Sequence, residues 1–176
     1  MAAGHSAGMT IFHLRGATAA DADRIAEIYN QGIEDRLATL ETELRTVEER
    51  TEWLAARGPR HPVLVAETDG LVVAWASLNR FNPRPAYDHV ADFSIYIERA
   101  FRGRGAGRQL LTALVERARA LGYHKMVLAA FPFNPAGVSL YERLGFTTVG
   151  VYREQGRLDG KWVDVLLMER VFADAP

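Results

Sequence analysis

The sequence contains no cysteine among its 176 residues. This absence excludes disulfide bonds, a thiolate nucleophile and cysteine-based metal sites, and it agrees with a cytoplasmic location without deciding it. Neither sign of charge dominates, since 21 basic residues stand against 22 acidic ones. A chain so close to neutral does not predict nucleic acid as a partner.

Long apolar runs are also missing. No stretch approaches the ~18 uninterrupted apolar residues that a membrane span requires, so we expect no membrane association. Residues 1–8 are small and lack the apolar segment of a signal peptide, and we interpret them as a disordered leader, a tag remnant or an alternative start. Residues 9–172 are expected to form a single domain, because a chain of this length with 48% apolar residues can bury one core. A short tail follows over 173–176.

Metal-binding motifs are absent as well. The five histidines show no metal-ligand spacing, H-E-x-x-H does not occur, and the acids near Asp159 are too few for a calcium loop. We therefore expect no metal ion.

What the sequence does contain is an alternation of strand-like and helix-like segments. Turn and cap signals such as Asp69-Gly70 and Asn134-Pro135 separate them, residues 35–45 show no period, and 79–85 predicts a loop. The predicted strands cover 11–14, 62–67, 71–77, 89–97, 125–131, 146–154 and 162–172, and the predicted helices cover 18–34, 46–56, 109–121 and 136–144. The order β-α-α-β-β-β-α-β-α-β-β, without a repeat or linker, predicts one mixed α/β domain.

The most distinctive stretch is Arg-Gly-Arg-Gly-Ala-Gly-Arg at 102–108, which joins the strand 89–97 to the helix 109–121. Glycines at such a junction let backbone N–H groups approach an anion, and the helix N-terminus adds partial positive charge. Three arginines add guanidinium groups that suit phosphate oxygens. The stretch therefore predicts a binding site for a pyrophosphate.

Three interpretations of this loop compete. A nucleotide P-loop requires Lys-Ser/Thr after its last glycine, and Arg-Gln follows Gly107. A dinucleotide fingerprint requires a third glycine where Arg108 stands and an acid in the next strand, 125–131, which has none. A glycine-rich turn with a solvated basic face stays open if the loop is considered alone.

The loop agrees with a second signal further along the chain. Arg-x-x-Gly-x-Gly at 102–107, preceded by the strand segment 93–97, resembles the acetyl-CoA signature of the GNAT N-acetyltransferase superfamily. Asn134 and the run Leu-Tyr-Glu-Arg-Leu-Gly-Phe at 140–146 resemble that superfamily's last helix and the strand after it. The order of elements matches too, so the resemblance implies a GNAT-type mixed central sheet flanked by helices.

Five further segments are similar to the phosphinothricin acetyltransferase branch, and most of all to its arsinothricin-resistance relatives. They are Ile-Tyr-Asn at 28–30, Ala-Thr-Leu-Glu at 38–41, Arg-Pro-Ala-Tyr at 84–87, Ser-Ile-Tyr-Ile at 94–97 and Gly-Arg-Leu-Asp-Gly-Lys-Trp at 156–162. The resemblance implies that acetyl-CoA acetylates the α-amino group of a small glutamate-like amino acid, such as phosphinothricin, arsinothricin, methionine sulfoximine or methionine sulfone. It also implies a homodimer.

The same resemblance assigns the contacts with acetyl-CoA. Backbone groups of the strand would pair with the pantetheine arm, and N–H groups of the glycine loop would bind the pyrophosphate. Asn134 either contacts the pantetheine or caps its own helix, because one side chain serves only one of these roles well. The implied contacts are Ile95, Tyr96, Ile97, Arg102, Gly103, Arg104, Gly105, Ala106, Gly107, Arg108, Asn134 and Tyr141.

Amide formation from a thioester requires a neutral amine, an oriented thioester and a proton for the departing thiolate. Asp92 is the candidate base. The branch usually carries the longer glutamate at this position, so the shorter Asp92 favours a water that bridges it to the amine. His89 is the alternative base. Asp92 could instead serve only to accept N–H groups at the strand edge. Tyr141, two helical turns after Asn134, is the candidate acid, or else a tyrosine packed into the core.

An anionic amino acid needs cations and hydrogen-bond donors. Arg80, Arg84 and Tyr87 precede the strand with the candidate base, and Thr39 and Glu41 lie between the first two predicted helices. We predict that these five residues bind the acceptor, although an exposed arginine is often simply solvated.

Two other functions stay open. Acetylation of a protein N-terminus or of a lysine would favour an open acidic groove, whereas this chain places arginines in the substrate loop. A non-catalytic acyl-CoA-binding domain would keep residues 102–108 and have no use for Asp92 or Tyr141.

Overall fold

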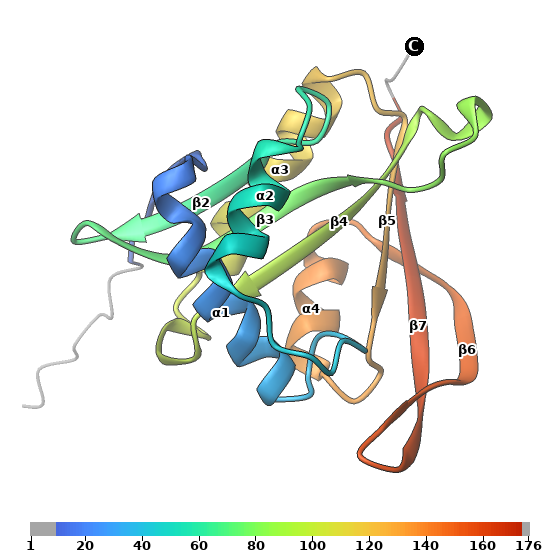
Figure 1. Ribbon diagram of the computed structural model, residues 1–176. Coiled ribbons are helices and arrows are strands. Elements are labelled where there is room, and N and C mark those ends of the chain that lie inside the picture. The colour runs from blue at the N-terminus through green and yellow to red at the C-terminus, as the bar shows by residue number, and fades with distance from the viewer. Residues whose placement is uncertain (1–9, 174–176) are drawn as a thin grey trace, which may run out of the picture.

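The computed structural model describes residues 10–173 (Figure 1). The predicted leader over 1–8 and the last residues of the predicted tail lie outside this range. The helices are α1 (Ala22–Glu34), α2 (Val47–Ala55), α3 (Ala106–Ala120) and α4 (Pro135–Arg143). The strands are β1 (His13–Gly16), β2 (Val63–Thr68), β3 (Leu71–Arg80), β4 (Val90–Ile97), β5 (Lys125–Ala130), β6 (Thr147–Leu158) and β7 (Lys161–Val171). The predicted order of elements is confirmed.

The seven strands form one sheet in the order β1-β2-β3-β4-β5-β7-β6. Among the described strands, β4 and β5 are the one parallel pair, and the other neighbours are antiparallel. A parallel pair needs a crossover connection, and α3 supplies it. The predicted mixed sheet is therefore confirmed, with its parallel junction near the middle.

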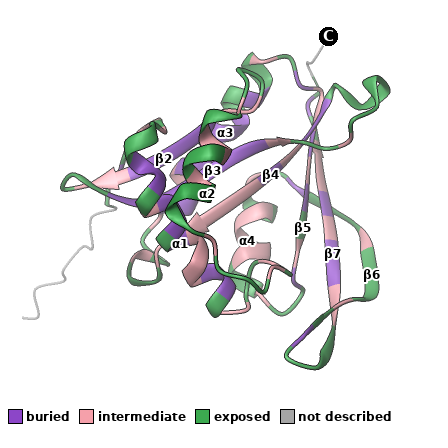
Figure 2. Ribbon diagram, viewed as in Figure 1, coloured by how far each residue is buried: buried purple, intermediate pink, exposed green. Residues whose placement is uncertain are grey.

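Helices cover both faces of this sheet (Figure 1). Ile25 and Ile28 of α1 pack with Trp75 on one face, whereas Leu110 and Leu114 of α3 are fully buried against the other. Each buried leucine stabilises the fold by about 1.5–3 kcal/mol. Figure 2 shows many of the buried residues on strands β2 and β3. No helix within residues 10–173 combines the length and apolar character that crossing a membrane requires.

Several boundaries differ from the prediction, among them that of the first strand, which was predicted at 11–14 and lies at His13–Gly16. Asn79 and Arg80 belong to β3 rather than to a loop, because β4 continues alongside and pairs Asp92 with Asn79. Helix α3 begins at Ala106, so the last part of the glycine loop is already helical. Strand β6 extends to Leu158, which shortens the predicted turn before β7 to two residues.

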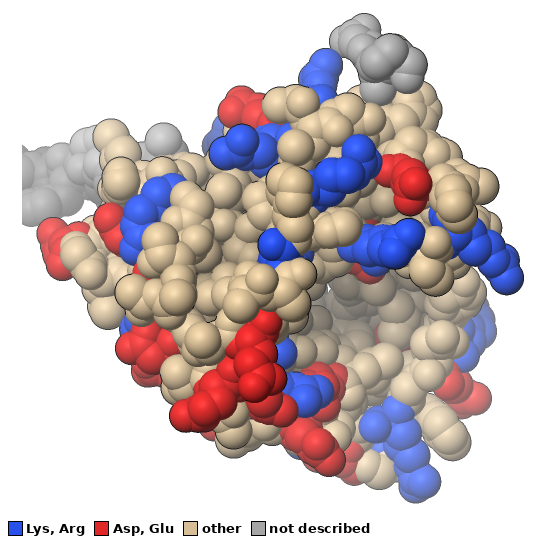
Figure 3. All heavy atoms as spheres, turned by 45° about the horizontal axis from the view of Figure 1, so that its top comes forward, with Lys and Arg blue, Asp and Glu red and all other residues tan. Residues whose placement is uncertain are grey.

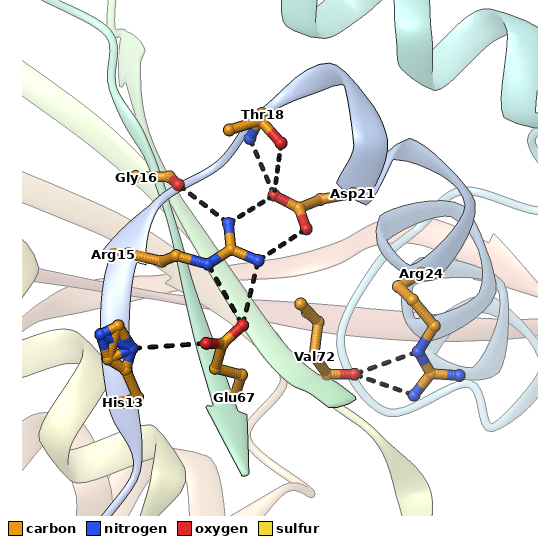
Figure 4. A network of polar contacts seen from close by, with 8 residues as sticks. All are labelled: His13, Arg15, Gly16, Thr18, Asp21, Arg24, Glu67 and Val72. Carbon is orange, nitrogen blue, oxygen red and sulfur yellow. Dashed lines mark hydrogen bonds and ion pairs between the residues drawn. The ribbon is translucent and has the colours of Figure 1, made fainter. Parts of the chain in front are cut away.

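A network of charged side chains joins β1 to the start of α1 (Figure 4). Arg15 donates to both carboxylate oxygens of Asp21 at 2.8 and 2.9 Å, and to Glu67 of β2 at 3.1 Å. Asp21 is buried, and the Arg15 guanidinium holds the pKa of its carboxyl below the usual range. The backbone N–H of Thr18 donates a further bond to Asp21 at 2.8 Å. This network holds the N-terminal end of α1 against the sheet.

Candidate active site

The sheet opens between β4 and β5. Their pairing ends at Asp92 and Val127, although β4 continues to Ile97. Just beyond the strand, the backbone N–H of Glu98 donates to a carbonyl of β3 at 2.8 Å. Because backbone groups alternate in direction along a strand, those of Ile95 and Ile97 turn away from β3 and toward the opening. The opening therefore offers backbone donors and acceptors for a ligand lying along β4.

A cavity of about 250 Å³ lies in this opening. Figure 3 shows a hollow in the surface, at the same horizontal position as β4 and β5 in Figure 1. Nowhere in residues 10–173 do three or more His, Cys, Asp or Glu side chains gather so that they could hold a metal ion. The predicted site residues that line the cavity are Thr39, Asp92, Ile95, Tyr96, Asn134 and Tyr141.

Asp92 lies where the two strands part. The backbone N–H of Phe93 donates to its carboxylate, and the residue is half-buried. Burial raises the pKa of this carboxyl from 3.8 to about 6, and the bond from Phe93 opposes the shift only in part. At pH 7 the group is ionised and more basic than an exposed aspartate. These properties suit a proton acceptor.

Tyr141 reaches the cavity from α4. Its ring stands edge-on to Phe93, with the centroids 5.9 Å apart. The helix ends directly afterwards, because Gly145 with φ +82° lets its N–H reach the carbonyl of Glu142 and lets the N–H of Phe146 reach that of Tyr141, each at 3.0 Å. This Schellman motif fixes the turn that carries Tyr141. Burial raises the pKa of its phenol to about 12, so the hydroxyl keeps a proton that it can donate at pH 7.

The glycine loop leads into the N-terminus of α3. Gly103 and Gly105 have φ values of +76° and +92°, which residues with a β-carbon rarely adopt. Gly105 is the N-cap residue, and no side chain caps the helix there. The N–H groups of residues 106–108 have no acceptor within the helix, as in any first turn. They form the kind of site that binds a phosphate anion.

Gly107 lets α3 approach its neighbours closely. A β-carbon at this position would lie 2.8 Å from Cδ1 of Ile97 and 3.2 Å from Cδ2 of Leu140. The first distance is shorter than van der Waals contact allows, so the side chains of Ile97 and Leu140 would have to move to admit a larger residue. The glycine thus keeps the anion-binding turn beside the opened strand.

The three arginines of the loop make different contacts. Arg102 forms an ion pair with Asp35 at 2.6 Å, whereas the guanidinium of Arg104 lies over the ring of Phe101, 5.0 Å from its centroid. Arg108 is exposed on the first turn of α3. The arginines therefore surround the loop with positive charge, and Arg102 is also held by an acid.

Asn134 uses both ends of its side chain. Its Oδ1 accepts the N–H of Gly137 at 3.2 Å and so caps α4, while its Nδ2 donates to the carbonyl of Leu37 at 3.1 Å. The side chain thereby ties the α1–α2 connection to the start of α4. The capping role is present, and the contact with pantetheine stays a prediction.

Tyr96 contributes an aromatic wall. Its ring stacks on Trp75 with the centroids 5.0 Å apart and meets Tyr29 edge-on at 4.9 Å. Burial raises the pKa of the Tyr96 phenol, and a hydrogen bond from Thr39 opposes the rise. The family resemblance implies a contact of Tyr96 with the cofactor and gives no sign of this cluster, which depends on residues from three separate elements.

Apolar walls of the cavity were missed altogether. Leu37 and Leu40 come from the connection between α1 and α2, and Phe131 follows β5. Gly156 of β6 lies behind Leu40, since a β-carbon at 156 would overlap the Leu40 side chain. The segment 35–45 has no hydrophobic period, so its sequence carries no sign that these leucines close a cavity.

Four predicted acceptor residues lie outside the cavity. Arg80 is the last residue of β3, Arg84 and Tyr87 lie in the connection to β4, and all three residues are exposed. The carboxylate of Glu41 accepts two N–H groups of its own loop and pairs with Arg45. Contacts between these four residues and an acceptor remain predictions.

Comparison with known proteins gives matches over most of the chain. The model of the acetyltransferase (GNAT) family matches residues 24–146, a range that includes β4, α3 and the cavity residues of α4. An L-methionine sulfoximine/L-methionine sulfone acetyltransferase of Pseudomonas paraeruginosa is 35% identical over 158 residues, which make up 89% of this chain and 92% of the relative.

Two solved structures share the fold along nearly the whole chain. A GNAT superfamily phosphinothricin acetyltransferase from Sinorhizobium meliloti, in complex with AcCoA, is 31% identical with a TM-score of 0.89, and the match covers 94% of this chain and 91% of that one. A ribosomal-protein-alanine N-acetyltransferase from Brucella melitensis is 35% identical with a TM-score of 0.88, covering 91% and 99%.

Proposed function

The chain belongs to the acetyltransferase (GNAT) family, and from that premise we propose that it transfers the acetyl group of acetyl-CoA to the α-amino group of a small amino acid. The family, the fold and the acyltransferase class expected from the sequence are confirmed. What the proposal adds is the assignment of roles to this chain's own residues.

One observation carries the proposal: Asp92 and Tyr141 line the same cavity at the point where β4 and β5 separate. At pH 7 a carboxyl group with a pKa of about 6 is ionised, and a phenol with a pKa of about 12 is protonated. An ionised base and a protonated acid therefore line the same small cavity, and these are the protonation states that acyl transfer needs. A domain that only bound acyl-CoA would have no use for this pair.

Acetyl-CoA supplies the thioester that the amine attacks. The chain offers groups that fit it, because the backbone of Ile95 and Ile97 faces the opening and the first turn of α3 presents free N–H groups to a pyrophosphate. Gly105 has no side chain beside this turn, and Gly107 leaves room for the side chains of Ile97 and Leu140.

In the proposed reaction the Asp92 carboxylate accepts a proton from the acceptor amine, directly or through one water. The neutral amine then attacks the thioester carbon, the carbon–sulfur bond breaks, the Tyr141 hydroxyl donates its proton to the departing sulfur, and the second proton of the attacking nitrogen replaces it on the Tyr141 oxygen, which leaves a neutral amide. No side chain forms a covalent intermediate. Because one cavity holds the amine, the thioester, the base and the acid, the reaction between two molecules becomes effectively unimolecular, which lowers its entropic barrier.

The size of the cavity favours a small acceptor. The cavity of about 250 Å³ is smaller than a typical drug-sized pocket, and it is lined on the side of the α1–α2 connection by Leu37 and Leu40, which are 39% and 38% exposed. We propose methionine sulfone, methionine sulfoximine, phosphinothricin and arsinothricin as the acceptors to test. Arg80 and Arg84 remain the predicted partners of an anionic acceptor. We further propose a homodimer and a cytoplasmic location.

A second function is favoured by one specific observation. The Brucella melitensis relative, named for acetylating ribosomal-protein alanine, is as similar in identity as the methionine sulfone enzyme. A protein N-terminus also presents an α-amino group. A peptide acceptor, however, would have to enter past Leu37 and Leu40, which argues for the free amino acid.

The two functions are separated by one set of assays. The wild-type protein is incubated with acetyl-CoA and each of the four proposed amino acids, or with a peptide that begins with alanine, and released CoA is measured. Turnover of at least one amino acid with a kcat/KM well above that of the peptide supports the proposal. Turnover of the peptide alone supports the second function. Light scattering tests the homodimer.

A further inference from the structure

The turn between β4 and the glycine loop is anchored to the end of α1. Arg99, in the short 3-10 turn Arg99–Phe101, donates through Nη2 to Oδ1 of Asp35 at 2.7 Å and through Nε to both of its carboxylate oxygens at 3.1 Å. The backbone N–H of Arg99 also donates to the side chain of Gln31 at 2.7 Å. Asp35 follows α1 directly, so it connects the helix to this turn.

The same carboxylate holds the first arginine of the glycine loop. Nη1 of Arg102 lies 2.6 Å from Oδ2 of Asp35, and Nε of Arg102 donates to the carbonyl of Ile97 at 3.3 Å. The Asp35 side chain is only 20% exposed, and its bonds with Arg99 and Arg102 hold the pKa of its carboxyl below the usual range. Charge-assisted bonds of this kind are about twice as strong as neutral ones.

The backbone of the loop has few restraints of its own. Gly103 and Gly105 both have positive φ, and a β-carbon at Gly103 would meet nothing within 4 Å. A flexible loop binds an anion poorly because ordering it costs conformational entropy. Its entry is held instead by the two arginines that converge on Asp35.

We propose that Asp35 is a positioning residue for acetyl-CoA: by holding Arg99 and Arg102 it presents the glycine loop to the pyrophosphate in a single conformation. This inference rests on the proposed use of acetyl-CoA by this loop. With Glu34 also paired to Arg99, the two guanidinium groups and the two carboxylates of the cluster balance in charge. The carboxylate therefore acts through the arginines and does not repel the ligand.

The test compares Asp35→Asn with Glu34→Gln. Both substitutions remove one negative charge from the end of α1, and both remove a partner of Arg99, since Glu34 lies 3.2 Å from its Nη2. Asp35, unlike Glu34, also holds Arg102. Binding of CoA is measured by calorimetry, and KM and kcat are measured with acetyl-CoA and with S-acetylpantetheine, which has no pyrophosphate.

Asp35→Asn is expected to raise both the Kd of CoA and the KM for acetyl-CoA about tenfold. Its kcat at saturation and its KM for S-acetylpantetheine should stay within about twofold of the wild type. Glu34→Gln should stay within about twofold throughout, and Asp35→Glu, which keeps the charge, should bind CoA more tightly than Asp35→Asn.

Three results would overturn the inference. The first is an unchanged Kd for CoA in Asp35→Asn, and the second is a lower Kd, which is expected if the carboxylate repels the ligand. The third is a KM for S-acetylpantetheine that rises as much as the KM for acetyl-CoA. If the wild type binds CoA but acetylates none of the proposed amines, the proposed acceptors are wrong and calorimetry still decides the role of Asp35. If the wild type binds no CoA, both proposals fall.

Discussion

Replacing Asp92 by asparagine should make the protein more stable and less active at once. Burial raises the pKa of the Asp92 carboxyl from 3.8 to about 6 in the folded chain. Between these values the folded chain keeps a proton that the unfolded chain has released, so stability falls as the pH rises through this window. Above pH 6 the ionised carboxylate destabilises the fold by up to about 3 kcal/mol. Asparagine cannot ionise, and its oxygen can still accept the N–H of Phe93.

Thermal melts and steady-state kinetics measure the two effects. At this chain length 1 kcal/mol corresponds to about 2–4 °C, so Asp92→Asn should melt several degrees above the wild type at pH 8, and the difference should vanish near pH 4. Loss of the base should lower kcat/KM by about 10²- to 10⁴-fold. The wild-type kcat/KM should fall about tenfold per pH unit below pH 6 because the base becomes protonated. The kcat/KM of Asp92→Asn should not show this fall below pH 6.

Asp88→Asn is the matched control. The Asp88 side chain is 62% exposed in the connection that precedes β4, so its replacement should change stability by no more than about 0.5 kcal/mol. The reasoning is refuted if Asp92→Asn keeps wild-type turnover with an unchanged pH profile. It is also refuted if the variant is no more stable than the wild type at pH 8.

Three further predictions address other parts of the molecule. Tyr141→Phe should lower kcat about 10²-fold, because the variant has no hydroxyl proton to donate to the thiolate. Its KM for acetyl-CoA should stay within about twofold, because binding does not depend on that proton. Near-normal turnover at pH 7 would show that Tyr141 is not the acid. Gly107→Ala should destabilise the fold by about 1 kcal/mol and weaken CoA binding, because its β-carbon would crowd the terminal methyl groups of Ile97 and Leu140. At Gly150 a β-carbon would meet nothing within 4 Å, so Gly150→Ala should change neither property, and equal effects of the two substitutions would contradict this explanation. Asp21→Asn should lower the free energy of unfolding by about 3 kcal/mol at pH 7, because it breaks the bond with Arg15. Since the folded-state pKa of Asp21 is lowered, the wild-type advantage should shrink as the pH falls below about 4, and urea unfolding at several pH values measures this.

Local signals explain how much of the fold could be predicted. Thr46 and Glu49 form the expected capping box at the start of α2, with bonds of 2.8 and 3.2 Å. Gly145 ends α4 as expected, with positive φ. Such signals depend on neighbours within a few residues, so the sequence contains all that they need. The order of helices and strands could therefore be predicted from these local signals.

Contacts between distant segments explain what was missed. Leu37 closes the cavity because Asn134, 97 residues further on, bonds to its carbonyl. Asp35 lies beside the glycine loop because Arg102, 67 residues away, reaches it. Neither residue stands in a recognisable motif, and residues 35–45 carry no period. Only the packing of α1 and α4 around the opened sheet brings these groups together.

The identity of the product tests the central claim most directly. The wild-type protein, Asp92→Asn and Tyr141→Phe are each incubated with acetyl-CoA and, in separate reactions, with each of the four proposed amino acids and with the alanine peptide. The products are identified by mass spectrometry and by NMR of the α-proton. The account predicts one acetyl group on the α-nitrogen for each CoA released, formed by the wild type far faster than by either variant. No acetylation of any proposed amino acid by the wild type, together with acetylation of the alanine peptide, would contradict it.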